Sequence, residues 1–248
     1  MVLPIHPQKL NYFKKRFTSK GYNFEDKLIF RASPEVEKKL LEVHPDDIEE
    51  KLIKVGAMEI FRGKVISFYY RPLTLEFLQQ FYQFSEDTVS GIKSQGINEG
   101  FSRLRTMIDR DNITCIYLVE TKIKRFDELT GKKEVFEYGQ LLPDRTVFSM
   151  VDKHHRKEYR GEPTEVEVKE RLICRIPGVR GLEYCLDRVY QPELLPHYLE
   201  VEGTSESIFD KGVSRLGLNP SSFIDISVRT LLQKRRIQNV RLPLHHSS

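Results

Sequence analysis

Charged side chains alternate with apolar ones along several strand-length segments of this 248-residue chain. The clearest segment is YLEVEG at 198–203, where Glu200 and Glu202 are two residues apart and would point to one face of a strand. Leu199 and Val201 would point to the opposite face. Neighbouring carboxylates repel each other, and a chain that keeps them together usually binds a cation there. This alternation favours an antiparallel sheet with one apolar face and one charged face.

Four further segments show the same alternation, and their charged residues would share one face of each strand. A single solvated face is common in antiparallel sheets and is the simplest explanation. The alternative is a closed barrel with a charged interior, in which Lys and Arg bind phosphates and Glu holds Mg²⁺ or Mn²⁺ through its oxygens. Alternation by itself is compatible with both. The residues concerned are Arg103 and Arg105; Glu120, Lys122 and Lys124; Glu165, Glu167, Lys169 and Arg171; and Glu183 and Asp187.

Strand and helix patterns together predict an α+β protein with one antiparallel sheet system and several helices. The clearest helix is 45–56, which opens with a proline and two aspartates, carries an apolar face and ends at Gly56. The segment 73–95 is predicted to be a helix followed by a loop. Other strands are predicted at 64–71, 101–108, 113–125, 132–139, 164–176, 183–189 and 198–203, turns at 127–131 and 177–181, and helices at 144–160, 206–218 and 227–236.

The segment SPEVEKKLLEV at 33–43 fits two structures. As a strand it would place Glu35, Glu37 and Lys39 on one face. As a helix it would use Ser33 as the N-cap, with a proline at the first helical position and an acidic first turn. In the helix the two glutamates would not form a strand pair, and they would drop out of any site on the sheet.

The composition excludes several classes of protein. Charged residues make up 31% of the chain, but the formal net charge is only +4, so the mildly basic surface suits an anionic ligand and is not a nucleic-acid-binding tail. Cys115, Cys174 and Cys185 show no metal-binding spacing and are predicted to be buried thiols in a reducing compartment. There is no apolar run near the ~20 residues that span a bilayer and no signal-peptide core, which predicts a cytoplasmic or nuclear protein without membrane contact.

Three local features are predicted to have no catalytic role. The basic and aromatic stretch 1–31 predicts an extension docked on the main body, with nucleic-acid contact as the alternative. The histidine pairs at 154–155 and 245–246 are predicted to lie on the surface, because adjacent residues of one element do not share a face. The TSES run at 204–207 predicts a helix cap rather than a nucleophile.

Five motifs follow one another along the chain: EVEKK at 35–39, RLR at 103–105, ETKIKR at 120–125, VKERLICRI…EYCLDRV within 168–189, and YLEVEG at 198–203. In their order and spacing they resemble the CYTH superfamily, the triphosphate tunnel metalloenzymes. That family has a Glu-x-Glu-x-Lys strand followed by a helix, then Arg-x-Arg, Lys-bearing and Lys/Arg strands, a strand with a Leu-Asp pair, and a closing Glu-x-Glu strand. The resemblance covers roughly residues 33–232.

The resemblance implies an α+β fold with a closed antiparallel β-barrel, or tunnel, that has a charged interior and flanking helices. The tunnel domain would span 32–236, between the extension 1–31 and a C-terminal tail at 237–248. Mg²⁺ or Mn²⁺ would be held by Glu35, Glu37, Glu200 and Glu202, and Asp187, with Glu165 or Glu167, would assist them in catalysis. The substrate phosphates would be bound by Lys39, Arg103, Arg105, Lys122, Lys124, Lys169 and Arg171.

The activity implied by the resemblance is metal-dependent hydrolysis of an inorganic or organic triphosphate, with a carboxylate orienting the attacking water. The alternatives are an RNA 5′-triphosphatase, a class IV-type adenylate cyclase, and a non-catalytic protein that binds phosphate or RNA. The chain has no Trp to stack on thiamine, and its basic arm favours a polyanion. Repulsion among the glutamates would raise their pKa values, so metal affinity should weaken as the pH falls.

Overall fold

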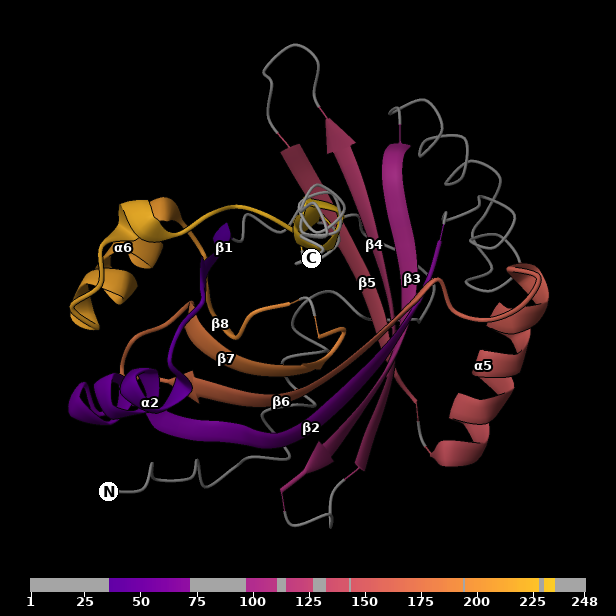
Figure 1. Cartoon of the computed structure of the whole chain (residues 1–248), viewed down its shortest axis with the longest axis horizontal. Helices are drawn as coiled ribbons and strands as arrows, with labels where there is room; N and C mark the ends of the chain where they lie inside the picture. Colours follow the sequence, from indigo (N-terminus) through magenta and orange to yellow (C-terminus); the bar gives the residue numbers. More distant parts are fainter. Residues whose placement is uncertain are drawn as a thin grey trace, which may run out of the picture. The chain divides into compact units, whose positions relative to one another are not determined.

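The computed structural model describes residues 36–71, 97–110, 115–126, 133–142, 144–193, 195–227 and 230–234. Within these residues the sheet has eight strands, in the hydrogen-bonded order β1-β8-β7-β6-β2-β3-β4-β5 (Figure 1). The strands are β1 (Val36–Leu41), β2 (Met58–Tyr70), β3 (Ile97–Asp109), β4 (Cys115–Phe126), β5 (Lys133–Leu142), β6 (Glu165–Arg175), β7 (Leu182–Gln191) and β8 (Tyr198–Gly203). The helices are α2 (Pro45–Lys54), α5 (Arg145–Glu158), α6 (Glu206–Arg215) and the short 3₁₀ helix η1 (Pro220–Ser222).

The fold is α+β, an antiparallel sheet with flanking helices, as the sequence predicts. Closure of the sheet into a barrel is not shown by this strand pairing. The chain divides into two compact units, and the division falls within β2 after Lys64 and within β6 after Val166. The first unit comprises the described residues 36–64 and 167–234, and the second unit comprises the described residues 65–166.

In the first unit, one face of the sheet is apolar and packs against helices α2 and α6, which Figure 1 shows beside β7 and β8. Leu199 and Val201 of β8 are fully buried in this core, as the alternation predicts. The same core includes Leu52 of α2 and Phe209 of α6. The apolar residues at every second position therefore fix which face carries the charges.

Residues 36–41 form strand β1, so the helix alternative is wrong for them. β1 pairs antiparallel with β8. On its other edge, the backbone N–H and C=O of Lys39 both bond to Ile224, at 2.9 Å each. Two sets of tertiary backbone hydrogen bonds outweigh the local capping pattern. Glu35, at the start of the motif, lies outside the described residues.

The second unit has its own core, between the sheet and helix α5. β3, β4 and β5 pair antiparallel. Tyr70, Leu104 and Val119 are fully buried, and Val147 and Val151 of α5 pack against them. The Asp144 side chain caps α5 by accepting a hydrogen bond from a backbone N–H of the first turn, and a helix is confirmed within the predicted range 144–160.

Strand β2 begins at Met58, six residues before the predicted start at 64. Glu59, Arg62 and Gly63 hide the strand pattern, because charged residues and glycine are rare inside strands. In the structure Arg62 donates to Glu59 at 2.8 Å and forms a bidentate pair with Glu49 of α2, at 2.9 and 2.8 Å. These ion pairs make the charged start of β2 compatible with burial.

Two predictions about single residues are wrong. His155 is not on the surface: it is fully buried, its Nε2 lies 2.7 Å from the Ser102 hydroxyl, and its Nδ1 donates to the Val151 carbonyl at 2.9 Å. Cys115 is exposed, because it begins strand β4, whereas Cys174 and Cys185 are buried as predicted. A histidine such as His155 can be buried because both of its ring nitrogens are hydrogen-bonded.

Several predicted segments fall on residues that are not described, namely 1–31, 73–95, 127–131, His245–His246 and the tail 237–248. Of the last predicted helix, residues 230–234 are described and are helical. Ser205 caps α6 by accepting from the Ile208 N–H, which confirms the predicted cap at 204–207. Within the described chain, no helix has the length and apolar character needed to cross a bilayer.

Candidate functional site

The charged face of the first unit is organised as rows that run across strands β1, β8 and β7. Residues in one row face one another in the antiparallel register, where opposite Cβ atoms lie about 4.5–5.5 Å apart. The first row, called the acidic row below, is Glu37, Glu202 and Glu183; the second is Lys39, Glu200 and Cys185; the third is Leu41, Tyr198 and Asp187. The register therefore places three carboxylates abreast on adjacent strands.

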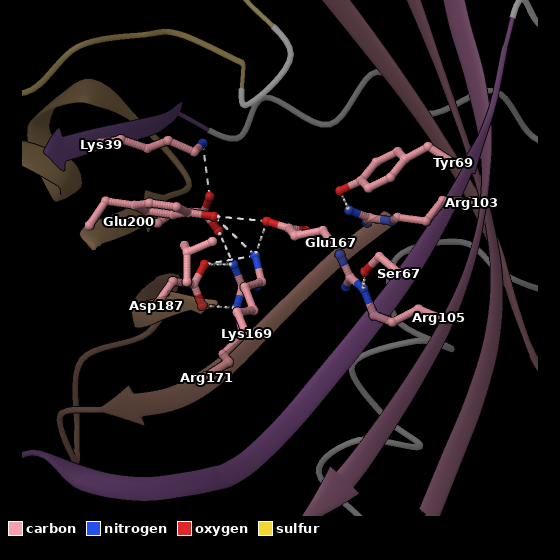
Figure 2. Close-up of polar contacts among 12 residues, drawn as sticks. Lys39, Ser67, Tyr69, Arg103, Arg105, Glu167, Lys169, Arg171, Asp187 and Glu200 are labelled. Carbon is pink, nitrogen blue, oxygen red and sulfur yellow. Dashed lines mark hydrogen bonds and ion pairs between the residues drawn. The ribbon is translucent and has the colours of Figure 1, made fainter. Parts of the chain in front are cut away.

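Lys39 points from β1 toward the carboxylates of the charged face (Figure 2). Its ammonium lies 2.8 Å from Glu200 Oε2 and also bonds to Glu37, and only 4% of the residue is exposed. Burial alone would lower the pKa of Lys39, but the charges of Glu200 and Glu37 raise it above its ordinary value. Lys38 points to the other side, where it meets Glu206 of α6 at 2.8 Å. Of the two lysines in the motif, Lys39 is the one that reaches the site, as predicted.

Asp187 of β7 anchors two cations of β6 (Figure 2). Arg171 donates to both of its oxygens, at 2.7 and 2.6 Å, and the Lys169 ammonium lies 2.8 Å away. Asp187 is fully buried. Burial would raise its pKa, but Arg171 and Lys169 hold it below the ordinary range. Two cations are thus fixed on one buried carboxylate, with their remaining donors directed at neighbouring groups.

Those remaining donors link the cations to three further side chains. Lys169 lies 3.0 Å from Glu167 Oε1 and 3.0 Å from the Tyr198 hydroxyl. Arg171 also donates to Glu200 Oε1, at 3.1 Å. Glu200 is therefore held from both sides, by Lys39 of β1 and Arg171 of β6. Its pKa is nevertheless raised, first by burial and then by the charge of Glu37, with a smaller contribution from Glu202.

The described part of this face carries more negative than positive charge. Six carboxylates face four cationic side chains, which leaves an excess of two negative charges. Within the acidic row, Glu37 contacts Lys39, which it shares with Glu200, and Glu183 contacts Arg175, so three carboxylates face one cation of their own and one shared cation. The carboxylates are Glu37, Glu167, Glu183, Asp187, Glu200 and Glu202, and the cations are Lys39, Lys169, Arg171 and Arg175.

This donor set fits a divalent cation. Glu37, Glu200 and Glu202 offer carboxylate oxygens from two adjacent strands, and such oxygens are the ligands that Mg²⁺ and Mn²⁺ prefer. The Lys39 ammonium already occupies a position between Glu37 and Glu200, so the geometry accommodates a positive charge there. A bound cation would neutralise the excess charge of the row.

A separate cluster of cations lies in the second unit. Arg103 donates to Glu120 Oε2 at 3.0 Å and to the Tyr69 hydroxyl at 3.3 Å, and Arg105 lies 3.4 Å from the same carboxylate oxygen (Figure 2). Burial would raise the pKa of Glu120, but Arg103 and Arg105 lower it to about 2. Lys122 follows Glu120 on the same face of β4. Two arginines against one buried carboxylate give this cluster the cationic groups expected of an anion site.

The structure brings seven predicted site residues together in the first unit: Glu37, Lys39, Lys169, Arg171, Asp187, Glu200 and Glu202. It places Arg103, Arg105 and Lys122 in the second unit. Glu35 and the side chain of Lys124 lie outside what the structure describes. Glu165 falls in the second unit, two residues before Glu167. The catalytic, metal-binding and phosphate-binding roles of all these residues stay predictions.

Three residues of the first unit were missed as site residues. Alternation predicts Glu183 on the charged face of β7 with Asp187, but the motifs gave it no role in a site, and Cys185, two residues before Asp187, could have been found by the same alternation. Tyr198 lies opposite Asp187, and only the register between β7 and β8 reveals it. Two residues of β2 in the second unit were also missed. The Ser67 hydroxyl accepts from Arg105 at 3.4 Å, and the Tyr69 hydroxyl accepts from Arg103 at 3.3 Å.

Solved structures with this fold include proteins from archaea and bacteria. The PH1012 protein of Pyrococcus horikoshii aligns at a TM-score of 0.53 and 17% identity, over 79% of this chain and 98% of its own. The PH1819 protein of the same organism aligns at 0.52 and 19% identity, over 82% and 99%. A proposed adenylate cyclase of Vibrio parahaemolyticus aligns at 0.50 and 14% identity, over 82% and 99%.

At these identities the likeness concerns the fold alone. No family model matches the sequence, and no curated protein matches it either. The chain shares its fold with the proposed adenylate cyclase of Vibrio parahaemolyticus over nearly all of that protein's length, and this agrees with the resemblance predicted from the motifs.

Proposed function

We propose that this chain is a metal-dependent hydrolase of triphosphates that binds its substrate on the charged face of the first unit. The observation that carries the proposal is the adjacency of two groups on that face. A row of carboxylates with excess negative charge lies next to buried Lys39, Lys169 and Arg171. A triphosphate with its divalent cation needs both kinds of group at one place, because the cation and the phosphate oxygens must be bound together.

In this proposal Glu37, Glu200 and Glu202, with Glu35, hold Mg²⁺ or Mn²⁺ through carboxylate oxygens. When bound, the cation supplies Lewis-acid stabilisation of charge on the phosphate oxygens. Lys39, Lys169 and Arg171 bind the phosphate oxygens by charge-assisted hydrogen bonds. Asp187 binds Arg171 and Lys169 and fixes their side chains, so that their N–H donors stay in place when the substrate binds.

The reaction is an in-line attack by water on the terminal phosphorus. The new bond joins the water oxygen to phosphorus, and the bond from phosphorus to the bridging oxygen breaks, which releases inorganic phosphate and a diphosphate. A carboxylate of the charged face orients the water and accepts its proton. Glu200, in the row next to the acidic row, has a raised pKa and is suited to hold that proton. Buried cations stabilise the charge that develops on the leaving group.

The second unit enters the proposal through Arg103, Arg105 and Lys122, with Lys124, as a further set of phosphate-binding groups. Their charge supports phosphate binding, since Arg103 and Arg105 both contact Glu120 and Lys122 follows it on the same face of β4. A closed tunnel in which both sets act on one substrate stays a prediction of the family resemblance.

The second candidate is an adenylate cyclase. It is favoured by the fold shared with the proposed adenylate cyclase of Vibrio parahaemolyticus. With ATP as substrate, a cyclase would release diphosphate and a cyclic nucleotide, whereas a triphosphatase would release inorganic phosphate and ADP. A binding protein without turnover, and a hydrolase specific for RNA 5′ ends, are the remaining alternatives.

The test measures the products formed from tripolyphosphate, ATP, thiamine triphosphate and triphosphate-ended RNA, with Mg²⁺ or Mn²⁺ and with a chelator. We expect inorganic phosphate only when the metal is present. The variant Glu200→Gln/Glu202→Gln keeps side-chain size and should lose at least about a hundredfold in rate, the effect typical of removing an electrostatic catalytic group.

The matched control is Glu193→Gln, because Glu193 is an exposed glutamate of the same unit and lies in the connection between β7 and β8 rather than on a strand of the charged face. Phosphate release that survives in the double variant at the control's rate would refute the proposal. Tight phosphate binding without release of any product would favour the binding protein instead.

A further inference from the structure

A thiol lies among the carboxylates of the charged face. Cys185 is fully buried on β7, two residues after Glu183 and directly opposite Glu200. Donor atoms of Glu183, Cys185 and Glu202 all lie within 4.8 Å of one another. Glu183 and Glu202 face each other in the acidic row, so the thiol completes a compact set of three metal-binding side chains from two strands.

The surroundings of this thiol differ from those of the other buried cysteine. Cys174 faces the opposite side of the sheet and belongs to the apolar core with Leu172, Ile176 and Leu182. That is the usual place for a buried cysteine, which behaves as a small apolar residue. Cys185 instead has carboxylates beside it on its own strand and opposite it on β8. The Cys185 thiol donates a weak hydrogen bond to Glu183 Oε1, at 3.8 Å.

The separation of the donors is close to what a shared cation requires. In a tetrahedral zinc site the sulfur lies about 2.3 Å and the oxygens about 2.0–2.2 Å from the metal, so sulfur and oxygen ligands are roughly 3.5–4 Å apart. The Cys185 sulfur and Glu183 Oε1 already lie within that range. The third donor, Glu202, comes from a half-buried side chain at 4.8 Å or less, which a small rotamer change can bring nearer. Three protein ligands leave a fourth position open, as in catalytic zinc sites.

We propose that Glu183, Cys185 and Glu202 bind one divalent cation through two carboxylates and a thiolate, and that this set of ligands prefers borderline cations such as Zn²⁺ to Mg²⁺. Glu202 would be shared between this set and the oxygen ligands Glu37 and Glu200. Thiolates select such cations, whereas Mg²⁺ takes oxygen ligands. Binding breaks the S–H bond, forms a sulfur–metal bond and releases one proton to solvent. This inference rests on the proposed function only in placing a divalent cation on the charged face.

The experiment uses Co²⁺ and Cd²⁺ as probes, because a thiolate bound to either gives an ultraviolet charge-transfer band. The full chain, freed of metal with a chelator, is titrated while absorbance and proton release are followed. We expect a band that saturates at one metal per chain and the release of one proton. Cys185→Ser should abolish the band, and Glu202→Gln should weaken Cd²⁺ affinity by about tenfold or more.

The matched control is Cys115→Ser, since Cys115 is the exposed thiol and would bind Cd²⁺ adventitiously. A band that disappears in Cys115→Ser and survives in Cys185→Ser would overturn the inference, as would wild-type protein without any band. A second measurement needs no variant: X-ray absorption of the Zn²⁺-loaded protein should show one sulfur neighbour at about 2.3 Å. Oxygen and nitrogen neighbours alone would refute the thiolate ligand.

The two proposals fail in different ways. A missing sulfur ligand together with Mg²⁺-dependent phosphate release would refute the thiolate site and leave the triphosphatase standing. A sulfur–metal band in a protein that releases no phosphate from any triphosphate would do the reverse.

Discussion

Removing the charge of Asp187 is expected to lower the free energy of unfolding more than removing any other single charge of the first unit. It is fully buried and accepts two short hydrogen bonds from Arg171 and one contact from Lys169. In Asp187→Asn the shape is retained, but an amide N–H₂ replaces one acceptor oxygen. Lys169 and Arg171 then lose the carboxylate that they share, and Lys169 keeps Glu167 and the Tyr198 hydroxyl while Arg171 keeps Glu200.

The loss in free energy of unfolding depends on how deeply the ion pair is buried and not on how short its hydrogen bonds are. Breaking a buried ion pair by removing one partner costs about 3–5 kcal/mol, because an uncompensated charge is left behind. The exposed pair of Arg188 with Asp46 is equally short, at 2.7 Å, but Asp46 is 69% exposed. Removing a surface partner of this kind costs at most about 1 kcal/mol. Asp46→Asn is therefore a control with the same bond length and a different environment.

The assay is urea denaturation at pH 7, followed by circular dichroism, with the free energy of unfolding extrapolated to water. Asp187→Asn should lose about 3–5 kcal/mol and Asp46→Asn no more than about 1 kcal/mol. Tripolyphosphate should recover more stability in Asp187→Asn than in wild type, because the anion supplies the charge that the variant lacks. Equal losses in the two variants would refute the argument from burial.

Two further predictions concern other parts of the fold. Burial lowers the pKa of His155 to about 4, so the unfolded chain takes up the proton first, and stability should fall between about pH 6.5 and 4 by up to about 3 kcal/mol. Melting temperatures of wild type and His155→Gln should therefore converge as the pH falls, and parallel curves would contradict this. A Cβ on Gly203 would lie 2.9 Å from the backbone nitrogen of Phe209, so Gly203→Ala should cost about 1–3 kcal/mol in denaturation. Gly212→Ala, which would meet only the Leu182 side chain, should cost less, and the reverse order would be evidence against rigid packing at Gly203.

The sequence predicts the faces of the strands well, because side-chain direction has a period of two whatever the partner strand. The division between Leu199 and Glu200 follows from alternation alone, and the structure places the first in the core and the second on the charged face. The sequence does not predict register, since register depends on which strands meet and where their turns end. The opposition of Cys185 and Glu200, and of Asp187 and Tyr198, is a property of the pairing.

The errors have the same origin. The surface prediction for His155 comes from its pairing with His154, since adjacent residues do not share a face, but Ser102 of β3 lies beside His155 and hydrogen-bonds to its ring nitrogen. The first residues of β2 were missed because Arg62 looks unfavourable in a strand until Glu49 of α2 is placed beside it. Each partner is distant in sequence, so local patterns carry no information about it. Residues 36–39 of the EVEKK motif are the opposite case, since local capping favours a helix there but pairing with β8 makes these residues a strand.

Register also separates two glutamates that alternation treats as equivalent. Glu200 lies opposite Lys39 and receives a bond from Arg171, so it belongs to the network of paired charges. Glu202 lies between Glu37 and Glu183, in the row where negative charge is in excess. Replacing Glu200 would leave buried Lys39 and Arg171 without their shared carboxylate, whereas replacing Glu202 would remove one ligand of the bound metal ion. The two glutamates of one Glu-x-Glu motif thus lie in adjacent rows. Glu202 is placed to bind a metal ion, and Glu200 holds the lysine and arginine that would bind phosphate. A triphosphate with its metal ion needs both kinds of group side by side.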